Sequence, residues 1–271
     1  MKESSQSKLI RQAFRTNKIT PEVKKAVKNC LKALDTGKAR ICEKINGKWQ
    51  VNDSLKSAIL LYFKMTKMQN FQSGDFNFFD KIPLKKWTGK EGVRVVPQAL
   101  VRYGSYVAKN TVLMPSYINI GAYVDEGSLI DTWATVGSCA QVGKSVHVSG
   151  GVGLGGVLEP VQAQPVIIED HVFLGSRAII VEGVQVCENA VIGAGVVLTS
   201  STKILDVTQK KVKEYVGIVP KNSVVIPGAR NKKFPSGDYS VPCALIIGKR
   251  SEKTNKKISL NDCLREFNVP V

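Results

Sequence analysis

Residues 106–204 carry a repeat with a period of six. Counting by six from Tyr106 to Val148, every position holds tyrosine, valine or isoleucine, and a second aliphatic run extends in the same way from Ile168 to Ile204. Two residues before each of these positions stands a residue no larger than valine or asparagine. Because a helix repeats every 3.6 residues and a plain strand every two, a period of six predicts a very short strand followed by a corner.

Units of this kind stack into a solenoid. Each hexapeptide forms one face, three faces close a triangular coil of about 18 residues, and the two repeated columns point inward. The repeat therefore predicts about five coils, joined by backbone hydrogen bonds and covered at both ends. A sandwich of short strands is the alternative, but such folds have turn signals every 8 to 12 residues or so and no strict register. We expect a mainly β chain with a parallel β-helix at its centre.

The first 90 residues follow a different pattern, which predicts a small α-rich domain. Thr20, followed by a proline, marks the start of a helix, and Gly37 marks its end. The Asn46-Gly47 pair predicts a hairpin turn, and residues 69–90 predict an irregular connection into the solenoid. Apolar residues recur at helical spacing in two groups: Leu9, Ile10, Ala13 and Phe14, and then Val23, Ala26, Val27, Leu31 and Leu34.

The pattern divides the chain into three parts: the α-rich domain (1–90), the β-helix (91–228) and a C-terminal cap (229–271) with a strand near 244–247 and a helix near 260–267. Val148 and Ile168 are twenty residues apart, which is not a multiple of six and predicts a glycine-rich insertion at 149–165. This insertion contains a G-x-G-x-x-G pattern, but a dinucleotide fingerprint opens a helix, and here prolines follow. It is either a flap or backbone cradle beside a ligand or a plain corner insertion.

The chain carries 39 Lys and Arg against 22 Asp and Glu, a formal charge of +17, which raises the question of a nucleic-acid partner. The excess lies in the flanking parts, because residues 101–200 hold 4 basic and 8 acidic residues. The lysines stand singly or in pairs without interleaved aromatic residues, so a solvated surface is favoured over a polynucleotide groove. We expect no nucleic-acid partner, although a positive field attracts small anionic substrates.

Six cysteines are scattered without a CxxC pair, and the two histidines, His147 and His171, lack metal-ligand spacing. We expect reduced thiols and no protein metal site. The longest apolar run, residues 58–63, is far shorter than the roughly 20 residues of a membrane span, and the N-terminus has no stretch typical of a signal peptide. These features predict a cytoplasmic protein with no membrane partner.

Four strings carry a resemblance: EGVRVVP at 91–97, NIGAYVDE at 119–126, DTWATVGSCAQ at 131–141 and SGGVG at 149–153. With the six-residue columns, they resemble the hexapeptide-repeat acyltransferases, and among these the tetrahydropyridine-2,6-dicarboxylate N-succinyltransferase family. The resemblance extends over essentially the whole chain. It implies a left-handed coil, which the period cannot give because parallel crossovers are otherwise right-handed.

The resemblance also implies a reaction. Succinyl-CoA, a co-substrate and not a permanently bound cofactor, donates its acyl group to the amino group of ring-opened tetrahydrodipicolinate in lysine and diaminopimelate biosynthesis. The family's substrate-binding arginine and aspartate match Arg94 and Asp131. A guanidinium grips a carboxylate in a two-pronged fork, and a carboxylate holds an ammonium and accepts its proton, so Asp131 is also the catalytic candidate. From the residues alone, a surface ion pair for Arg94 and a backbone-bonding corner residue for Asp131 are the alternatives.

One departure from the family concerns an expected acid. A glutamate often follows the Gly-x-Arg of the second repeat run, but this chain has Ile179 at that position. Asp131 then does more, or Glu182 substitutes. Related acyltransferases use a histidine base, but His147 is expected to point outward and His171 to lie at a corner.

Lysine and arginine suit the phosphates of CoA, and Lys203, Lys221 and Arg230 are the candidates, with simple solubility as the alternative reading. The resemblance implies a homotrimer with active sites between neighbouring chains. Two other functions stay open. One is another CoA-dependent acyltransferase of the same fold, such as a sugar-amine or serine acetyltransferase, and the other is a non-enzymatic scaffold or RNA-binding protein.

Overall fold

The computed structural model describes residues 4–250. Its N-terminal part consists of three helices, α1 (Ser5–Thr16), α2 (Pro21–Asp35) and α3 (Asp53–Met65), and one hairpin, β1 (Cys42–Ile45) and β2 (Lys48–Val51). The Thr20 hydroxyl accepts a hydrogen bond from the backbone N–H of Val23, and proline occupies the first helical position, as the start signal predicts. Asn46 and Gly47 both have positive φ, which the tight hairpin turn requires. The helix and hairpin predictions are confirmed.

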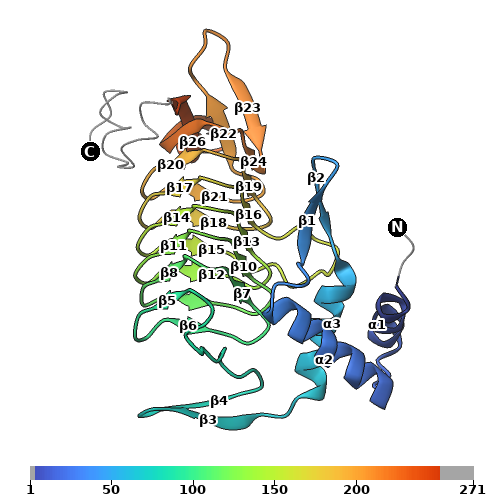
Figure 1. Cartoon of the computed structure of the whole chain (residues 1–271). Coiled ribbons are helices and arrows are strands. Elements are labelled where there is room, and N and C mark those ends of the chain that lie inside the picture. Colours follow the sequence, from blue (N-terminus) through green and yellow to red (C-terminus); the bar gives the residue numbers. More distant parts are fainter. Residues whose placement is uncertain (1–3, 251–271) are drawn as a thin grey trace.

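The centre of the molecule is a three-sided coil, here called the prism, built from three parallel ladders of two-residue strands (Figure 1). The chain passes from ladder A to ladder B to ladder C in every coil. Ladder A comprises β5 (Arg94–Val95), β8 (Val112–Leu113), β11 (Leu129–Ile130), β14 (His147–Val148), β17 (Phe173–Leu174), β20 (Val191–Ile192) and the start of β25 (Ser223–Phe234). Ladder B comprises β6 (Leu100–Val101), β9 (Tyr117–Ile118), β12 (Thr135–Val136), β15 (Gly153–Leu154), β18 (Ile179–Ile180) and β21 (Val197–Leu198). Ladder C comprises β7 (Tyr106–Val107), β10 (Tyr123–Val124), β13 (Gln141–Val142), β16 (Ile167–Ile168), β19 (Gln185–Val186) and β24 (Ile218–Val219).

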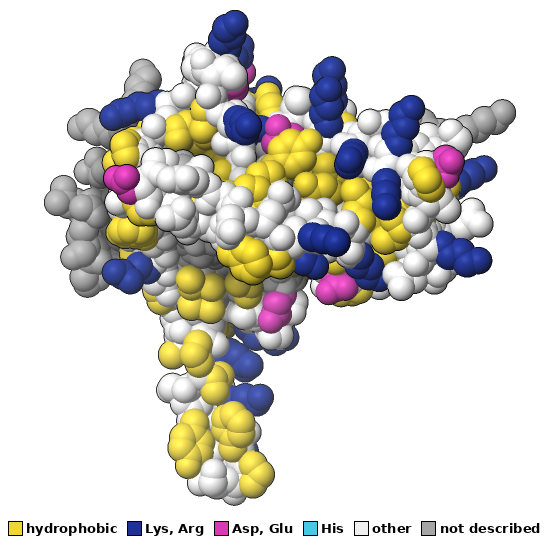
Figure 2. Space-filling model, turned by 90° about the horizontal axis from the view of Figure 1, so that it is seen from below, with side chains coloured by type: hydrophobic (Ala, Val, Ile, Leu, Met, Phe, Trp, Pro, Cys, Tyr) yellow, Lys and Arg dark blue, Asp and Glu magenta, His cyan; other side chains and the backbone are white. Residues whose placement is uncertain are grey.

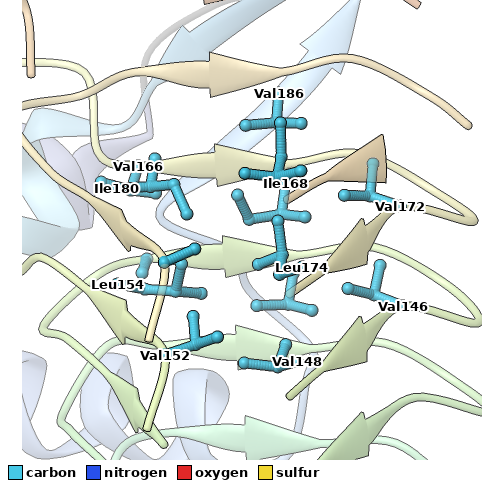
Figure 3. Packing of buried hydrophobic residues seen from close by; sticks show 14 of the residues in the cluster. Val146, Val148, Val152, Leu154, Val166, Ile168, Val172, Leu174, Ile180 and Val186 are labelled. Atoms are coloured by element: carbon cyan, nitrogen blue, oxygen red, sulfur yellow. The ribbon is translucent and has the colours of Figure 1, made fainter. Parts of the chain in front are cut away.

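The predicted columns form the core of the prism. Val148, Leu174 and Ile192 are fully buried along ladder A, and the smaller residues two positions before them, Val146, Val172 and Ala190, are buried as well. Figure 3 shows Val148, Leu174 and other aliphatic side chains of these columns stacked from coil to coil inside the prism. Such burial of aliphatic groups is the main stabilising contribution of the fold. The hexapeptide β-helix prediction is confirmed.

The register at the start of the prism differs from the prediction. Tyr106 and Val112 are half-buried on the outside, and their neighbours Val107 and Leu113 point inward. The reason is a corner that is one residue short, between β8 and β9. Tyr106 pairs with Tyr123 and Val112 with Leu129, each 17 positions later, whereas the next rung, from Tyr123 to Gln141, is 18 positions long. The repeat also begins earlier, at β5 and β6, so ladders B and C each have six strands. The prism therefore has six coils and not five.

The insertion also lies later than predicted. Strand β15 continues the six-residue count directly after β14, and Leu154 points into the core. Gly153 pairs with Ile179, 26 positions later, so the extra residues follow β15 at the corner between ladders B and C. There the chain passes so close to Gly137 that a Cβ atom on it would lie 2.3 Å from the Gly156 nitrogen. Residues 149–154 thus belong to a regular coil, and the insertion occupies 155–165.

The regions on either side of the prism contain more strand than predicted. Residues 69–80 form a hairpin, β3 (Gln69–Ser73) and β4 (Phe76–Asp80), where an irregular connection was expected. After ladder B ends, β22 (Lys203–Asp206) and β23 (Lys213–Val216) form a second hairpin, and β25 pairs with β26 (Gly237–Lys249) over a far longer stretch than the expected strand at 244–247. The helix expected near 260–267 lies outside the described residues. Within residues 4–250, no helix combines the length and apolar character needed to cross a bilayer.

Candidate functional site

The corner between ladders A and B places Asp131, Thr132 and Trp133 in succession between β11 and β12. The Asp131 N–H donates to the Val148 carbonyl at 2.9 Å, and the Trp133 N–H donates to the Pro115 carbonyl at 2.6 Å, so the corner is held from above and below. Trp133 has a φ of 61° and its indole is 70% exposed. Such an orientation leaves a large aromatic surface beside a carboxylate, as a ligand-binding edge requires.

One oxygen of Asp131 is already engaged and the other is open. Oδ1 accepts hydrogen bonds from the Thr132 N–H at 2.7 Å and from the Thr132 hydroxyl at 3.2 Å. Oδ2 faces Gly150 in the next coil, where a Cβ atom would stand 4.0 Å away. The backbone thus fixes the carboxylate and leaves Oδ2 able to accept a proton or hold an ammonium group.

A groove of about 490 Å³ runs over the outer face of ladder A. Leu129, His147 and Phe173 form its floor, and His171 and Asn189 lie at its edge, on the corner between ladders C and A. His147 stacks on Phe173 with ring centroids 4.8 Å apart. Both histidines lie where the sequence predicts, His147 on the outside of its strand and His171 at a corner. Asp131 follows two residues after Leu129, the register partner of His147, at the opposite edge of the same ladder.

Arg94 lies on this ladder too. It is exposed on β5, and the register runs from Arg94 to Val112 and on to Leu129, so Arg94 is two rungs from the groove floor. Neighbouring strands are about 4.8 Å apart, which puts two rungs at roughly 10 Å, a span that a small dicarboxylate and the long Arg94 side chain can bridge. Among residues 4–250, the Arg94 guanidinium has no ion pair, so the alternative of a surface ion pair is not what the structure contains. The structure therefore brings Arg94 and Asp131 to one face without direct contact.

The corner also contains a residue that the sequence reading did not assign. Arg177 has a φ of 59°, its N–H donates to the Gly150 carbonyl at 3.0 Å, and its side chain passes over Gly151. Trp133, Gly151 and Arg177 occupy the same place in successive coils. The six-residue count marks this place as a corner. Arg177 comes to lie directly above residue 151 only because the insertion loops out of the coil between them.

Glycines 150 and 151 lie beside Asp131, whereas the insertion proper lies at the other end of ladder B. There the fully buried Lys56 on α3 donates from Nζ to the Ala163 carbonyl at 2.6 Å, and the Gln164 amide donates to the Gly183 carbonyl at 3.0 Å. Of the two readings, this supports the corner insertion, which packs against the N-terminal helices. The glycines of SGGVG are the part that lies near the candidate site.

The three candidate residues for binding the CoA phosphates lie in different places and do not form one cluster. Lys221 lines a cavity of about 330 Å³ with Lys211, Lys213 and Lys249. Lys203 forms an ion pair with Glu214 across the β22–β23 hairpin. Arg230 lies on the β25–β26 hairpin, and its buried Nε has no hydrogen-bond partner within residues 4–250.

Ile179, which stands where the family often has a glutamate, also has apolar surroundings in the structure. Ile179 lies on the outside of β18, where its Cδ1 occupies the space above Gly153. Glu182 lies at the following corner, where it accepts hydrogen bonds from the Ser200 N–H at 3.1 Å and the Ser200 hydroxyl at 2.6 Å. These bonds lower the pKa of Glu182. Glu182 is therefore engaged at the corner between ladders B and C, and Asp131 is the carboxylate at the corner between ladders A and B.

His147 predicts a pH effect on stability. Burial lowers the pKa of His147, and the nearby Asp131 carboxylate opposes this only in part. Below the ordinary histidine pKa of about 6.5, the unfolded chain takes up this proton before the folded chain does, so the folded state loses stability as the pH falls from there to the lowered pKa. We expect His147→Gln to flatten that decline when the free energy of unfolding in urea is measured between pH 5 and 7.5. Parallel curves for variant and wild type would contradict the assignment.

Comparisons with known proteins identify the relatives of this chain. Residues 6–65 match the family model described as the N-terminal part of tetrahydrodipicolinate N-succinyltransferase, and residues 165–200 match the hexapeptide repeat of succinyl-transferase. A 2,3,4,5-tetrahydropyridine-2,6-dicarboxylate N-succinyltransferase of Proteus mirabilis (strain HI4320) is 52% identical over 253 residues, 91% of each chain. One from Legionella pneumophila (strain Corby) is 51% identical over 95% of this chain and 96% of its own.

A solved structure resembles the fold. It is a 2,3,4,5-tetrahydropyridine-2-carboxylate N-succinyltransferase of Campylobacter jejuni, with a TM-score of 0.52 at 18% sequence identity. The match covers 82% of this chain and 62% of that chain. At this identity the likeness concerns the architecture alone.

Proposed function

Because the chain belongs to the 2,3,4,5-tetrahydropyridine-2,6-dicarboxylate N-succinyltransferase family, we propose that it transfers a succinyl group from succinyl-CoA to the amino group of ring-opened tetrahydrodipicolinate. The products are the N-succinyl dicarboxylate and free CoA, and the step belongs to lysine and diaminopimelate biosynthesis. The observation that carries this proposal is the identity of 51–52% over more than nine-tenths of both chains. The protein is accordingly an acyltransferase.

In the proposed mechanism, Arg94 grips a substrate carboxylate and Asp131 holds the substrate ammonium. The support for these roles is that both residues share ladder A and that Asp131 has one free oxygen. Asp131 Oδ2 takes a proton from the ammonium, and the amine nitrogen then attacks the thioester carbonyl carbon. A C–N bond forms, the C–S bond breaks through a tetrahedral oxyanion, and the second amine proton goes to the leaving CoA thiolate. An amine and a thioester are already reactive, so alignment is the main contribution of the protein and no acyl-enzyme is needed.

For the phosphates of CoA, we propose the lysine-lined cavity that contains Lys221. Four lysines line it, and Asp206 is the single acidic residue in its wall. Phosphate oxygens are strongly attracted to such a cluster. Lys203 and Arg230 remain secondary candidates, because the first is paired with Glu214 and the second lies on a different element.

We also propose a cytoplasmic homotrimer with parallel prisms. All five cysteines in the described part of the chain are free thiols, as expected of a reducing compartment. The strands of ladder B carry no charged residue, and Thr135 and Val197 on its outer face are exposed, which suits packing between copies. An interface of this kind places the Asp131 corner, which borders ladder B, at a boundary between two chains.

The direct test is thiol release from CoA esters by purified protein. We expect release from succinyl-CoA that depends on the dicarboxylate amine, and much slower release from acetyl-CoA. Acetyl transfer to a sugar amine or to serine, with none of succinate to the dicarboxylate, would favour the acetyltransferase alternative. Tight, salt-dependent RNA binding without any thiol release would favour the non-enzymatic reading.

A further inference from the structure

Helix α2 presents a row of lysines to the solvent, here called the lysine row. Lys24, Lys28 and Lys32 stand four residues apart, with Lys25 beside the first, and all four are exposed. Residues four apart lie above one another on a helix, at a rise of about 6 Å. The opposite face of α2 is apolar and buried, and it comprises Val23, Ala26, Val27, Cys30, Leu31 and Leu34. The helix is therefore held by one face, and the other is open to a second molecule.

Neighbouring carboxylates do not balance the charge of the lysine row. Within residues 4–250, none of its four lysines forms an ion pair. The two acidic residues of α2 are engaged otherwise, because Asp35 binds Lys85 and Glu22 bonds back to Thr20. Like charges four residues apart on a helix repel each other and destabilise it slightly. The fold therefore gains nothing from this arrangement of lysines.

The lysine row lies in a strongly basic part of the chain. Residues 4–65 hold 14 Lys and Arg against 4 Asp and Glu. Two of these four acidic residues, Asp35 and Asp53, are paired with Lys85 and Arg11. Figure 2 shows the molecule from the N-terminal end of the prism, where basic side chains spread across the N-terminal helices with few acidic side chains among them. A surface of this kind attracts anionic partners.

The chemistry of the lysine row indicates an acidic protein helix as that partner. A second copy of this chain presents the same basic surface, which would repel the row. Single-stranded nucleic acid is held by aromatic rings as well as by cations, and α2 contains no aromatic residue. A helix that binds a membrane surface inserts its apolar face, and α2 buries that face in its own domain. Carboxylates four residues apart on another helix have the same spacing of about 6 Å as the lysines.

We propose that the lysine row docks an acidic helix of a different protein, with glutamate or aspartate at every fourth position opposite Lys24, Lys28 and Lys32. The pairs are open to solvent, so the contact is weak and depends on ionic strength. Charged pairs of this kind mainly set the rate of encounter and the choice of partner. On the buried face of α2, Leu31 packs against Gly104, at a corner between ladders B and C and not at the Asp131 corner. The inference goes beyond succinyl transfer and does not depend on it.

The test measures the fluorescence anisotropy of a dye-labelled helical peptide with glutamate at every fourth position. We expect the full-length wild type to bind this peptide at low salt, and Lys24→Glu/Lys28→Glu to bind it about 10-fold or more weakly. The matched control, Lys232→Glu/Lys233→Glu, changes the formal charge by the same amount on an exposed part of the β25–β26 hairpin, and it is expected to bind as the wild type does. A second peptide, with lysine in place of glutamate, is expected to prefer Lys24→Glu/Lys28→Glu over the wild type.

A milder variant guards against a loss of folding. Lys28→Gln/Lys32→Gln removes two charges but keeps good helix formers, and it is expected to weaken binding of the glutamate peptide with an unchanged circular dichroism spectrum. Succinyl transfer by all these variants is expected to equal that of the wild type.

Three results would overturn the inference. The first is a wild type that does not bind the glutamate peptide, and the second is an equal loss of binding in the α2 variants and the hairpin control, which would show an effect of net charge alone. The third is tighter binding of the wild type to phosphatidylglycerol vesicles or to single-stranded RNA than to the peptide, lost in the same α2 variants. Absence of succinyl transfer in a protein that binds the peptide would remove the proposed function and leave this contact standing.

Discussion

Replacing Asp131 by asparagine should lower kcat for succinyl transfer by about 10²- to 10⁴-fold, the usual contribution of a positioned general base. The amide keeps the shape of the side chain, and its oxygen can still accept the hydrogen bond from the Thr132 N–H, so the corner should stay folded. What it loses is the free Oδ2 that takes the ammonium proton. Steady-state thiol release at saturating succinyl-CoA measures the effect.

Asp125 offers a matched control for this experiment. It lies at a corner of the same prism, and its Oδ1 accepts the N–H of the following residue, Glu126, at 2.8 Å, just as Asp131 accepts that of Thr132. Asp125 lies instead at the corner between ladders C and A, beside Arg40. Asp125→Asn should therefore leave kcat within a few-fold of wild type. Wild-type turnover in Asp131→Asn would refute the assigned role, and equal losses in both variants would point to the corners as structural elements.

The second large effect concerns the contact between α2 and the first coils of the prism. Lys85 is only 8% exposed, and its ammonium donates to the Asp35 carboxylate at 2.9 Å, to the Asp35 carbonyl at 2.7 Å and to the Ser105 carbonyl at 3.2 Å. The Asp35 carboxylate also accepts the Gly104 N–H at 3.0 Å. Asp35→Ala leaves a buried ammonium without its counter-charge, which costs about 3–5 kcal/mol. We expect a drop of that size in the free energy of unfolding in urea.

The control for this variant is Glu126→Ala. Glu126 pairs with Lys109 at 3.5 Å, but the two side chains are 40% and 67% exposed, and such solvent-accessible pairs contribute less than about 1 kcal/mol. Each variant removes one carboxylate from an ion pair and one further hydrogen bond, from the Gly104 N–H to Asp35 or from the Asn110 amide to Glu126, so the main difference between the two sites is burial. Equal losses would show that the Asp35 contact is no stronger than a surface pair.

Much of the candidate site follows from the hexapeptide register. The count of six places Asp131 at a corner and His147 on an outer face, and both lie there. The same count assigns Tyr106 and Val112 to the core and is wrong, because one residue is missing at the corner after Leu113. A local period cannot detect a shortened corner when both neighbouring positions are occupied by apolar residues.

The position of the insertion shows the same limit. Both the glycines at 149–153 and the segment 155–165 are compatible with a break in the count, and the sequence alone predicts an insertion that begins at residue 149. The structure favours the later one because Leu154 reaches the core and Lys56, more than a hundred residues away, binds the Ala163 carbonyl. No pattern within the insertion contains that information.

The amino-acid sequence alone was sufficient for the three-sided coil, for its inward columns from Ile118 onward and for the helices before it, because these depend on side chains a few residues apart that repeat with a constant period. The tertiary structure was needed for everything that joins distant segments: the stacking of residues 133, 151 and 177 at one edge, the Asp35–Lys85 pair, and the separation of Lys203, Lys221 and Arg230. The physical reason is that short-range order is set by local sterics and periodic burial. The pairing of distant residues depends instead on how coils of unequal length come into register and on which charged side chains become buried when the parts of the molecule pack together.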